Sequence, residues 1–271
     1  MKFLGYLFLL ITITTSCCPE EQRKPEVSLP VEFIDSLEVE QLNSLMTDTI
    51  INRYKAIGLF PVTDTRIIID LRYATSNNFM KKQLYDTLDH VYLQKIVVDR
   101  ISACQDFLDS IKPGYRLKIY DGVRPLQVQR EMWNALDTVP MWRRGKFVSN
   151  PIFGSVHNYG CAVDVTICNE EDEELDMGAG YDDFRDIAFP SKEKEFLESG
   201  ELSTDAYKNR LLLRSVMRSQ YFSNIPSEWW HFNAFSRPTS EKKFELLLSE
   251  SGEHQIWVSP KIIFEAEEPI E

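Results

Sequence analysis

Residues 155–168, which read SVHNYGCAVDVTIC, combine a clear secondary-structure pattern with an unusual group of polar residues. Apolar and polar side chains alternate over residues 162–168, and this pattern predicts a β-strand. His157 precedes the strand in an expected loop, and Gly160 allows the backbone to turn between the two. Asp164 lies inside the strand. The stretch therefore predicts one strand of a sheet, with a histidine and a carboxylate close to its start.

Outward from this strand, helical and strand patterns follow one another without regular βαβ alternation. Further strands are expected at residues 66–73, 115–121 and 228–235. Amphipathic helices are expected at residues 90–111, 125–136, 204–221 and 241–248, and a loop at residues 140–153. This mixture favours the α+β class, a single domain with a mainly antiparallel sheet packed by helices.

The composition excludes several classes of protein. Of the 271 residues, 43% are hydrophobic and 27% are charged, which is ordinary for a globular protein. The net charge of −12 repels phosphate backbones, so we expect no nucleic-acid partner. Cys104, Cys161 and Cys168 are scattered and form neither a disulfide framework nor a CxxC metal site.

The N-terminus carries the pattern of an export signal. Lys2 is followed by an apolar run, Phe3 to Ile13, which is too short to span a bilayer comfortably. Small polar residues then lead to Cys17, and the arrangement resembles a bacterial lipoprotein signal at residues 1–16, with Cys17 lipidated. Cys18 is a rival for the lipid, and an ordinary cleaved secretory signal is the alternative.

The remaining chain divides by composition into three parts. Residues 17–45 contain three prolines and a charged run, which predicts a tether. Residues 46–250 carry the patterns of the folded domain, and residues 251–271 form an acidic tail. Together with the signal, these boundaries predict a cell-envelope protein held to the membrane only by an N-terminal lipid.

A second polar segment, EWWHF at residues 228–232, complements the first. His157, Asp164 and His231 would give zinc two imidazoles and one carboxylate, and Glu228 could act as a base. Residues three apart on an ideal strand point to opposite faces, so Glu228 and His231 need a bulge or a strand start to meet. The alternative is that His157 and Asp164 are only hydrogen-bonded structural residues.

The two segments together resemble the SxHxxGxAxD and ExWH motifs of the zinc D-Ala-D-Ala dipeptidases, a family related to zinc D,D-carboxypeptidases. Other blocks resemble the family in the same order. They are DLRYAT at 70–75, YDGVRP at 120–125, Met177-Gly178 and Tyr181-Asp182. The similarity covers about residues 59–235. Segments 141–148 and 187–202 are longer than in compact members, which can change how much peptide a cleft admits.

This resemblance implies a role for each matching residue. One zinc ion per chain would be bound by His157, Asp164 and His231. Glu228 would be the catalytic base, and Arg124 would stabilise the oxyanion or hold the substrate carbonyl.

The resemblance also implies two substrate contacts. Asp182 would pair with the free ammonium group of the dipeptide, and Ser155 would lie near its C-terminal carboxylate. The implied activity is hydrolysis of D-alanyl-D-alanine, or a related cell-wall peptide, during cell-wall turnover. The alternatives are a D,D- or L,D-carboxypeptidase acting on longer muropeptides, and a non-catalytic zinc-containing module that binds peptidoglycan.

Overall fold

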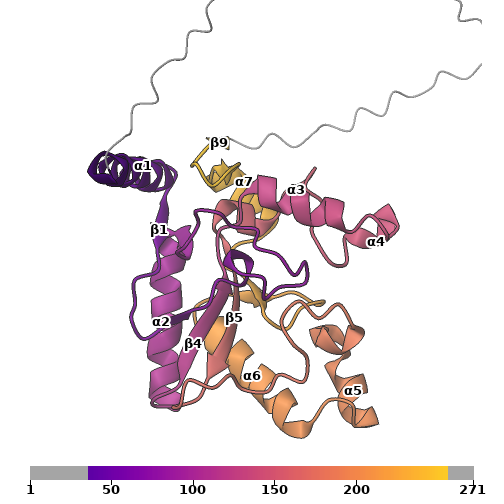
Figure 1. Ribbon diagram of the computed structural model, residues 1–271. Helices are drawn as coiled ribbons and strands as arrows, with labels where there is room; N and C mark the ends of the chain where they lie inside the picture. The colour runs from indigo at the N-terminus through magenta and orange to yellow at the C-terminus, as the bar shows by residue number, and fades with distance from the viewer. Residues whose placement is uncertain (1–35, 256–271) are drawn as a thin grey trace, which may run out of the picture. The chain divides into compact units, whose positions relative to one another are not determined.

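A five-stranded mixed sheet forms the frame of the fold (Figure 1). The computed structural model describes residues 36–255, and those from Leu42 onward belong to one compact unit. The strand order is β2(Ile68–Ile69), β4(Arg116–Asp121), β5(Ala162–Cys168), β7(His231–Asn233) and β6(Ser223–Asn224). Only the β2–β4 pair is parallel within this sheet. The predicted α+β domain with a mainly antiparallel sheet is confirmed.

The central strand β5 is buried along its whole length. It pairs with β4 on one side and with β7 on the other, and Asp164 lies directly opposite His231. Because side chains alternate between the two faces of a strand, Val163 and Val165 point one way and Asp164 the other. The sheet thus separates an apolar face from a face that carries the polar residues of the sequence motifs.

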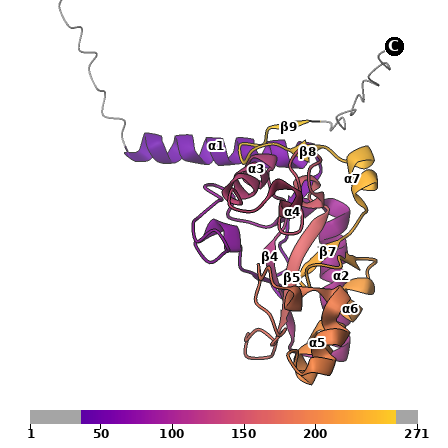
Figure 2. The ribbon, with the colours of Figure 1, turned by 90° about the vertical axis from the view of Figure 1, so that its right-hand side faces the viewer.

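Two long helices lie on the apolar face of the sheet. In α2(Lys95–Ile111) the buried side chains recur at helical spacing, and α6(Thr204–Arg218) packs beside it (Figure 2). The expected helix at 90–111 begins only at Lys95, because β3(Tyr92–Gln94) pairs with β1(Leu59–Pro61). This small two-stranded sheet lies against the turn before β5, since the backbone N–H of Gln94 donates to the carbonyl of Gly160.

Several expected elements are shorter or differ in type. The expected strand at 66–73 is β2 followed by the 3-10 helix η1(Arg72–Ala74), and the strand at 228–235 is confined to β7. The helix expected at 125–136 is α3(Leu126–Ala135), and the loop after it contains α4(Met141–Arg144). The prediction of a helix at 241–248 was wrong. The helix α7(Arg237–Lys243) lies earlier, and β8(Leu246–Leu247) pairs with β9(His254–Gln255).

The ends of the described chain are more regular than expected. The helix α1(Ser36–Ala56) includes residues 36–45, where an irregular tether was expected. At the other end β9 lies within the expected acidic tail. Residues 1–35, including Cys17, and residues 256–271 lie outside the described residues.

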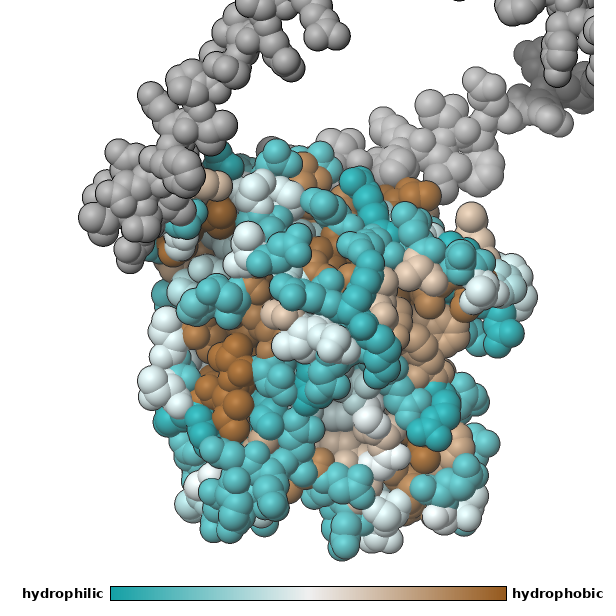
Figure 3. Space-filling view, viewed as in Figure 1, coloured by the Kyte–Doolittle hydropathy of each residue, from teal (hydrophilic) through white to brown (hydrophobic). Residues whose placement is uncertain are grey.

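None of the described helices is long and apolar enough to cross a membrane. Side chains on the face shown in Figure 3 are mostly hydrophilic, and apolar ones gather there in separate patches.

The segment at 187–202 is anchored by a buried cluster of charges. It forms two 3-10 helices, η3(Asp186–Ala188) and η4(Pro190–Lys192), and the short helix α5(Glu193–Ser199). Glu193 accepts hydrogen bonds from Arg214 at 2.8 and 2.7 Å and from Arg210 at 3.3 Å. Arg210 also donates to the carbonyl groups of Met177 and Ile187. One carboxylate thereby ties this segment to α6.

We expect Glu193→Ala to be strongly destabilising, because it leaves two buried guanidinium groups without their carboxylate. Breaking a buried pair in this way costs about 3–5 kcal/mol, which lowers the melting temperature by roughly 6–20 °C in a domain of this size. Thermal unfolding would measure the change. Glu198→Ala on the exposed side of the same helix is the matched control and should melt like the wild type. Equal melting temperatures for both variants would contradict the prediction.

Candidate metal centre and active site

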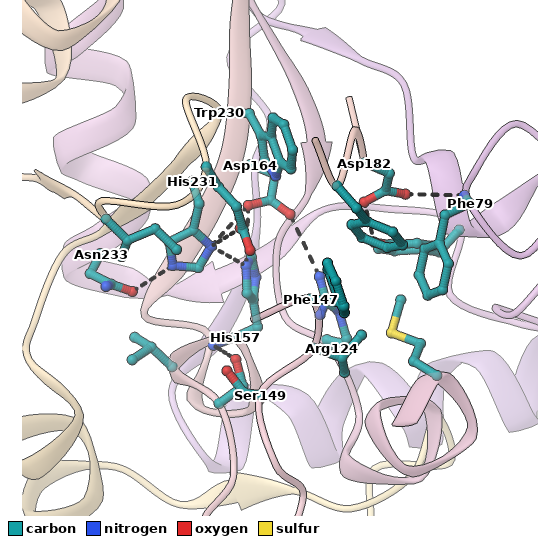
Figure 4. A pocket seen from close by; sticks show the side chains of 18 of the residues that line it. Phe79, Arg124, Phe147, Ser149, His157, Asp164, Asp182, Trp230, His231 and Asn233 are labelled. Carbon is teal, nitrogen blue, oxygen red and sulfur yellow. Dashed lines mark hydrogen bonds and ion pairs between the residues drawn. The ribbon is translucent and has the colours of Figure 1, made fainter. Parts of the chain in front are cut away.

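The polar face of the sheet borders a cavity of about 240 Å³ (Figure 4). The cavity is lined by all seven residues that the sequence marked for zinc, catalysis and substrate contact. They are Ser155, His157, Asp164, His231, Glu228, Arg124 and Asp182. Tyr73, Phe79, Phe147, Phe184 and Trp230 contribute aromatic walls.

The loop before β5 presents His157 on a single 3-10 turn, η2(Val156–Tyr159). Ser155 caps this turn, since its Oγ accepts a hydrogen bond from the backbone N–H of His157 at 3.3 Å. The turn ends at Gly160, whose φ of +64° is readily adopted only by glycine. A Cβ at this position would also lie 2.4 Å from a methyl group of Leu59. The turn expected from Gly160 is confirmed.

A backbone carbonyl fixes the ring of His157. Its Nδ1–H donates to the carbonyl oxygen of Gly122 at 2.7 Å, so Nε2 is the nitrogen left free toward the cavity. Nε2 lies 3.3 Å from Oδ1 of Asp164 and 3.0 Å from Nδ1 of His231. Nδ1 of His231 is in turn 3.1 Å from the same Asp164 oxygen. Two imidazole nitrogens and one carboxylate oxygen therefore converge on one point.

This triangle fits a tetrahedral metal site. Ligand atoms at about 2.0–2.1 Å from a tetrahedral ion lie roughly 3.3–3.4 Å apart, close to the three distances observed. His157, Asp164 and His231 are all buried, and their donor atoms lie within 4.8 Å of one another. The group could hold a metal ion while leaving a fourth position for water, as catalytic sites do.

The charges around the triangle favour the ionised form of Asp164. Burial alone would raise the pKa of Asp164, but His157 and His231 outweigh it and hold the pKa well below its usual range. Asp164 raises the pKa of His231 despite the opposing effect of burial. A metal ion would therefore meet an ionised carboxylate and would displace a proton from Nδ1 of His231.

Glu228 lies beside this group, in the turn that precedes β7. Its Oε2 is 3.7 Å from Nδ1 of His231, and its backbone carbonyl accepts from the Asn224 side chain at 2.8 Å. Because β7 begins only at His231, the strict alternation of a strand does not separate the two side chains. This is the strand start that their spacing required. Burial raises the pKa of Glu228 to about 7.

Arg124 is a buried residue and has polar partners on several sides. Its Nε and Nη2 donate to the same oxygen of Asp121 at 2.9 and 2.7 Å, and Nη1 donates to Gln129 at 3.2 Å. Nη2 also lies 3.5 Å from Oδ2 of Asp164. The guanidinium is stacked over the Tyr73 ring, 4.9 Å from its centre. The group is thus held rigidly beside the proposed metal ligands.

Asp182 stands at another part of the cavity wall, next to Phe79 (Figure 4). It accepts a hydrogen bond from the Tyr73 hydroxyl at 3.0 Å and from the Phe79 backbone N–H at 3.3 Å. Its φ of +59° is uncommon for a non-glycine residue and costs conformational energy. Burial, followed by the charge of Asp164, raises its pKa to about 7. A cationic partner in the cavity would relieve this cost.

Sequence patterns missed the residues that support the site. Tyr181 donates to Oδ2 of Asp164 at 3.0 Å, and Asn233 contacts Nε2 of His231 at 2.9 Å. Tyr85 donates to Asp121, the partner of Arg124, at 2.7 Å. The period-two spacing of His231 and Asn233 on a strand was the one signal that could have linked that pair.

Comparison with known proteins agrees with this geometry. Residues 60–248 match peptidase family M15, described as D-ala-D-ala dipeptidase. A D-alanyl-D-alanine dipeptidase of Escherichia coli (strain K12) is 32% identical over 190 residues, which cover 69% of this chain and 90% of that protein. A D-alanyl-D-alanine dipeptidase of Enterococcus faecium is 26% identical over 201 residues, covering 65% and 90% of the two chains. On these matches, the chain belongs to the D-Ala-D-Ala dipeptidase family of metallopeptidases.

Proposed function

We propose that the protein is a zinc-dependent dipeptidase that hydrolyses D-alanyl-D-alanine to two D-alanines. The observation that carries the proposal is the convergence of His157, Asp164 and His231 on one point, with the carboxylate of Glu228 beside it. Two imidazoles and one carboxylate with an open fourth position suit catalytic zinc. When bound, zinc would act as a Lewis acid toward the scissile carbonyl and lower the pKa of a water molecule.

Glu228 serves as the general base in this proposal. Its carboxylate accepts a proton from the attacking water as the water oxygen bonds to the carbonyl carbon. It then donates that proton to the leaving nitrogen as the C–N bond breaks. A pKa raised by burial makes the group a stronger base than an ordinary glutamate, and the same group can return the proton.

Arg124 stabilises negative charge on the carbonyl oxygen, because its guanidinium is fixed beside the ligands before substrate arrives. We propose that Asp182 binds the substrate ammonium and that Ser155, which also caps the turn bearing His157, lies near its carboxylate. The two substrate termini would then be recognised at different parts of one cavity wall.

The size of the cavity supports a short substrate. A volume of about 240 Å³ lies below the range of roughly 300–1,000 Å³ that is common for drug-sized ligands. A free dipeptide can be accommodated in such a space, which is partly open to solvent. The alternative is a carboxypeptidase that trims longer peptides, and the experiment below would detect that activity.

The proposed location is the cell envelope, with the chain attached by a lipid on Cys17. The support is the apolar run at residues 3–13 followed by small residues and a cysteine. A role in the turnover of peptides released from the cell wall follows from this address and from the substrate class. Mass analysis of the mature N-terminus would test the lipid directly.

Metal analysis combined with a cleavage panel tests the proposed function. The purified protein should hold about one zinc ion per chain and should release D-alanine from D-Ala-D-Ala. N-acetyl-D-Ala-D-Ala and a muropeptide ending in D-Ala-D-Ala are the matched substrates. Faster cleavage of the longer substrates would show that the protein is a carboxypeptidase and not a dipeptidase. Zinc binding without any cleavage would favour a binding module.

We expect N-acetylation of D-Ala-D-Ala to reduce cleavage by roughly 10- to 100-fold. The acyl group removes the positive charge that would pair with Asp182 and leaves a desolvated carboxylate, which costs about 1–3 kcal/mol or more. The measurement is kcat/KM for both substrates. Asp182→Ala should reduce the difference in kcat/KM between the two substrates, mainly by slowing cleavage of the free dipeptide. If the difference is unchanged in this variant, Asp182 does not recognise the ammonium group.

We expect Arg124→Lys to act on turnover more than on substrate affinity. Lysine keeps the charge but cannot reproduce the planar fork that binds Asp121 and lies beside Asp164. Removing one donor from such a site lowers kcat by about 10²-fold, with a smaller change in KM. A pure rise in KM with unchanged kcat would assign Arg124 to ground-state binding.

A further inference from the structure

The two histidines of the metal-site triangle present opposite ring nitrogens to it. His157 turns Nε2 inward and His231 turns Nδ1 inward. Each ring therefore has an outer nitrogen, and each outer nitrogen has its own partner. For His157 the partner is the backbone carbonyl of Gly122 at 2.7 Å, and for His231 it is Oδ1 of Asn233 at 2.9 Å. One ring is held by the main chain and the other by a side chain.

We propose that Asn233 is a positioning residue of the metal centre: its carboxamide oxygen accepts Nε2–H of His231 and so holds the ring with Nδ1 turned toward the metal. The inference rests on the proposed metal-dependent function. Neutral imidazole carries its proton on only one nitrogen, and the hydrogen bond made by the outer nitrogen selects which one. A ligating histidine in proteins commonly has such an outer partner.

The surroundings of His231 show what this outer contact does. On the inner side Nδ1 lies 3.1 Å from Asp164 and 3.7 Å from Glu228. On the outer side Oδ1 of Asn233 lies 2.9 Å from Nε2, so the ring is held between two fixed groups. Without Asn233 a buried N–H would lose its acceptor and the ring would be free to turn away from the triangle.

The backbone of Asn233 is fixed in a way that suits a positioning role. Asn233 is the last residue of β7 and is paired on both sides, with Ala162 of β5 and with Ser223 of β6. Residues 231 and 233 are two apart on a strand, so their side chains project to the same face. A strand that is paired on both sides therefore sets the distance between the carboxamide and the imidazole, and Figure 4 shows Asn233 reaching His231 from the side away from Asp164.

The test compares zinc affinity in variants that keep or lose the acceptor. Asn233→Leu retains a similar branched shape but has no acceptor, whereas Asn233→Asp keeps an acceptor oxygen. Ser223→Ala is the control, because the Ser223 hydroxyl bonds the backbone carbonyl of Asn233 and not its side chain. Zinc dissociation constants come from competition with a chromophoric chelator. We expect Asn233→Leu to bind zinc about 10–100-fold more weakly, and the other two variants to bind it like the wild type.

A second readout follows ligand geometry without reference to turnover. The visible absorption spectrum of the cobalt(II)-substituted protein should change in Asn233→Leu and stay near that of the wild type in Asn233→Asp. If Asn233→Leu does not fold, Asn233→Ala serves in its place, with thermal unfolding as the check.

Wild-type zinc affinity and an unaltered cobalt spectrum in the folded Leu or Ala variant would overturn the proposal. So would an equal loss in the Leu and Asp variants, because the acceptor would then not be the feature that matters. These outcomes can be distinguished from a failure of the proposed function. A wild-type protein that binds zinc but does not cleave D-Ala-D-Ala refutes the dipeptidase and leaves the role of Asn233 to be measured by affinity.

Discussion

Glu228→Gln should lower kcat for D-Ala-D-Ala by about 10²- to 10⁴-fold, the range typical of general acid–base catalysis. Glutamine keeps the size of the side chain and its place in the cavity but cannot accept a proton from water. The backbone around it should be unchanged, since Asn224 holds the carbonyl of residue 228 and not its side chain. Zinc content should therefore stay near one ion per chain.

The pH dependence separates this role from others. As a base, Glu228 must be ionised, so kcat/KM should rise as the pH increases through its pKa. Burial raises that pKa to about 7, and a bound cation would lower it, so we expect the acid limb of the metal-loaded enzyme at or below about pH 7. The limb should be absent from the residual activity of Glu228→Gln. Full activity in the variant, or loss of its metal, would show that the assigned role is wrong.

The elements predicted best are those whose own residues determine them. The strand at 162–168 was predicted with its observed bounds, because its alternation is uninterrupted and both of its neighbours bury it. The body of α2 was also predicted, since its apolar residues recur at helical spacing over four turns. Local pattern is sufficient when a long element buries a complete stripe or face.

Short strands were predicted poorly for the opposite reason. β2 and β6 have two residues each, and β7 has three, so no periodicity can develop within them. They exist because they pair with β4, β5 and one another, which is a property of the fold and not of the segment. The wrong helix at 241–248 has the same origin, since buried Leu246 and Leu247 pair with β9 instead of continuing α7.

The candidate site shows the same division. His157, Asp164, His231 and Glu228 stand in two motifs that could be identified from residue type, spacing and family resemblance. The groups that orient them come from elsewhere: the carbonyl of Gly122, the hydroxyl of Tyr181 and the carboxamide of Asn233. A carbonyl has no side-chain signature, and tyrosine and asparagine are common, so only the folded geometry identifies these partners.

His231→Ala should reduce bound zinc from about one ion per chain to near zero, because a catalytic site has three protein ligands and two are too few to retain the ion. His157→Ala and Asp164→Ala should do the same. The chain offers matched controls: His90 and His254 are exposed and lie outside the triangle, so alanine at either position should leave the zinc content unchanged. Elemental analysis after dialysis makes the comparison.

Thermal unfolding tests the same assignment independently of elemental analysis. A metal that binds only the folded state stabilises it, by about 2.7 kcal/mol when the free ion is at 100 times its dissociation constant. A chelator should therefore lower the melting temperature of the wild type and of His90→Ala, but should not shift that of His231→Ala, which has no metal to lose. A full zinc equivalent in His231→Ala, or an equal chelator shift in all three proteins, would place the metal elsewhere. The triangle of His157, Asp164 and His231 would then be a hydrogen-bonded cluster, and the roles proposed for Glu228 and Asn233 would lose their common basis.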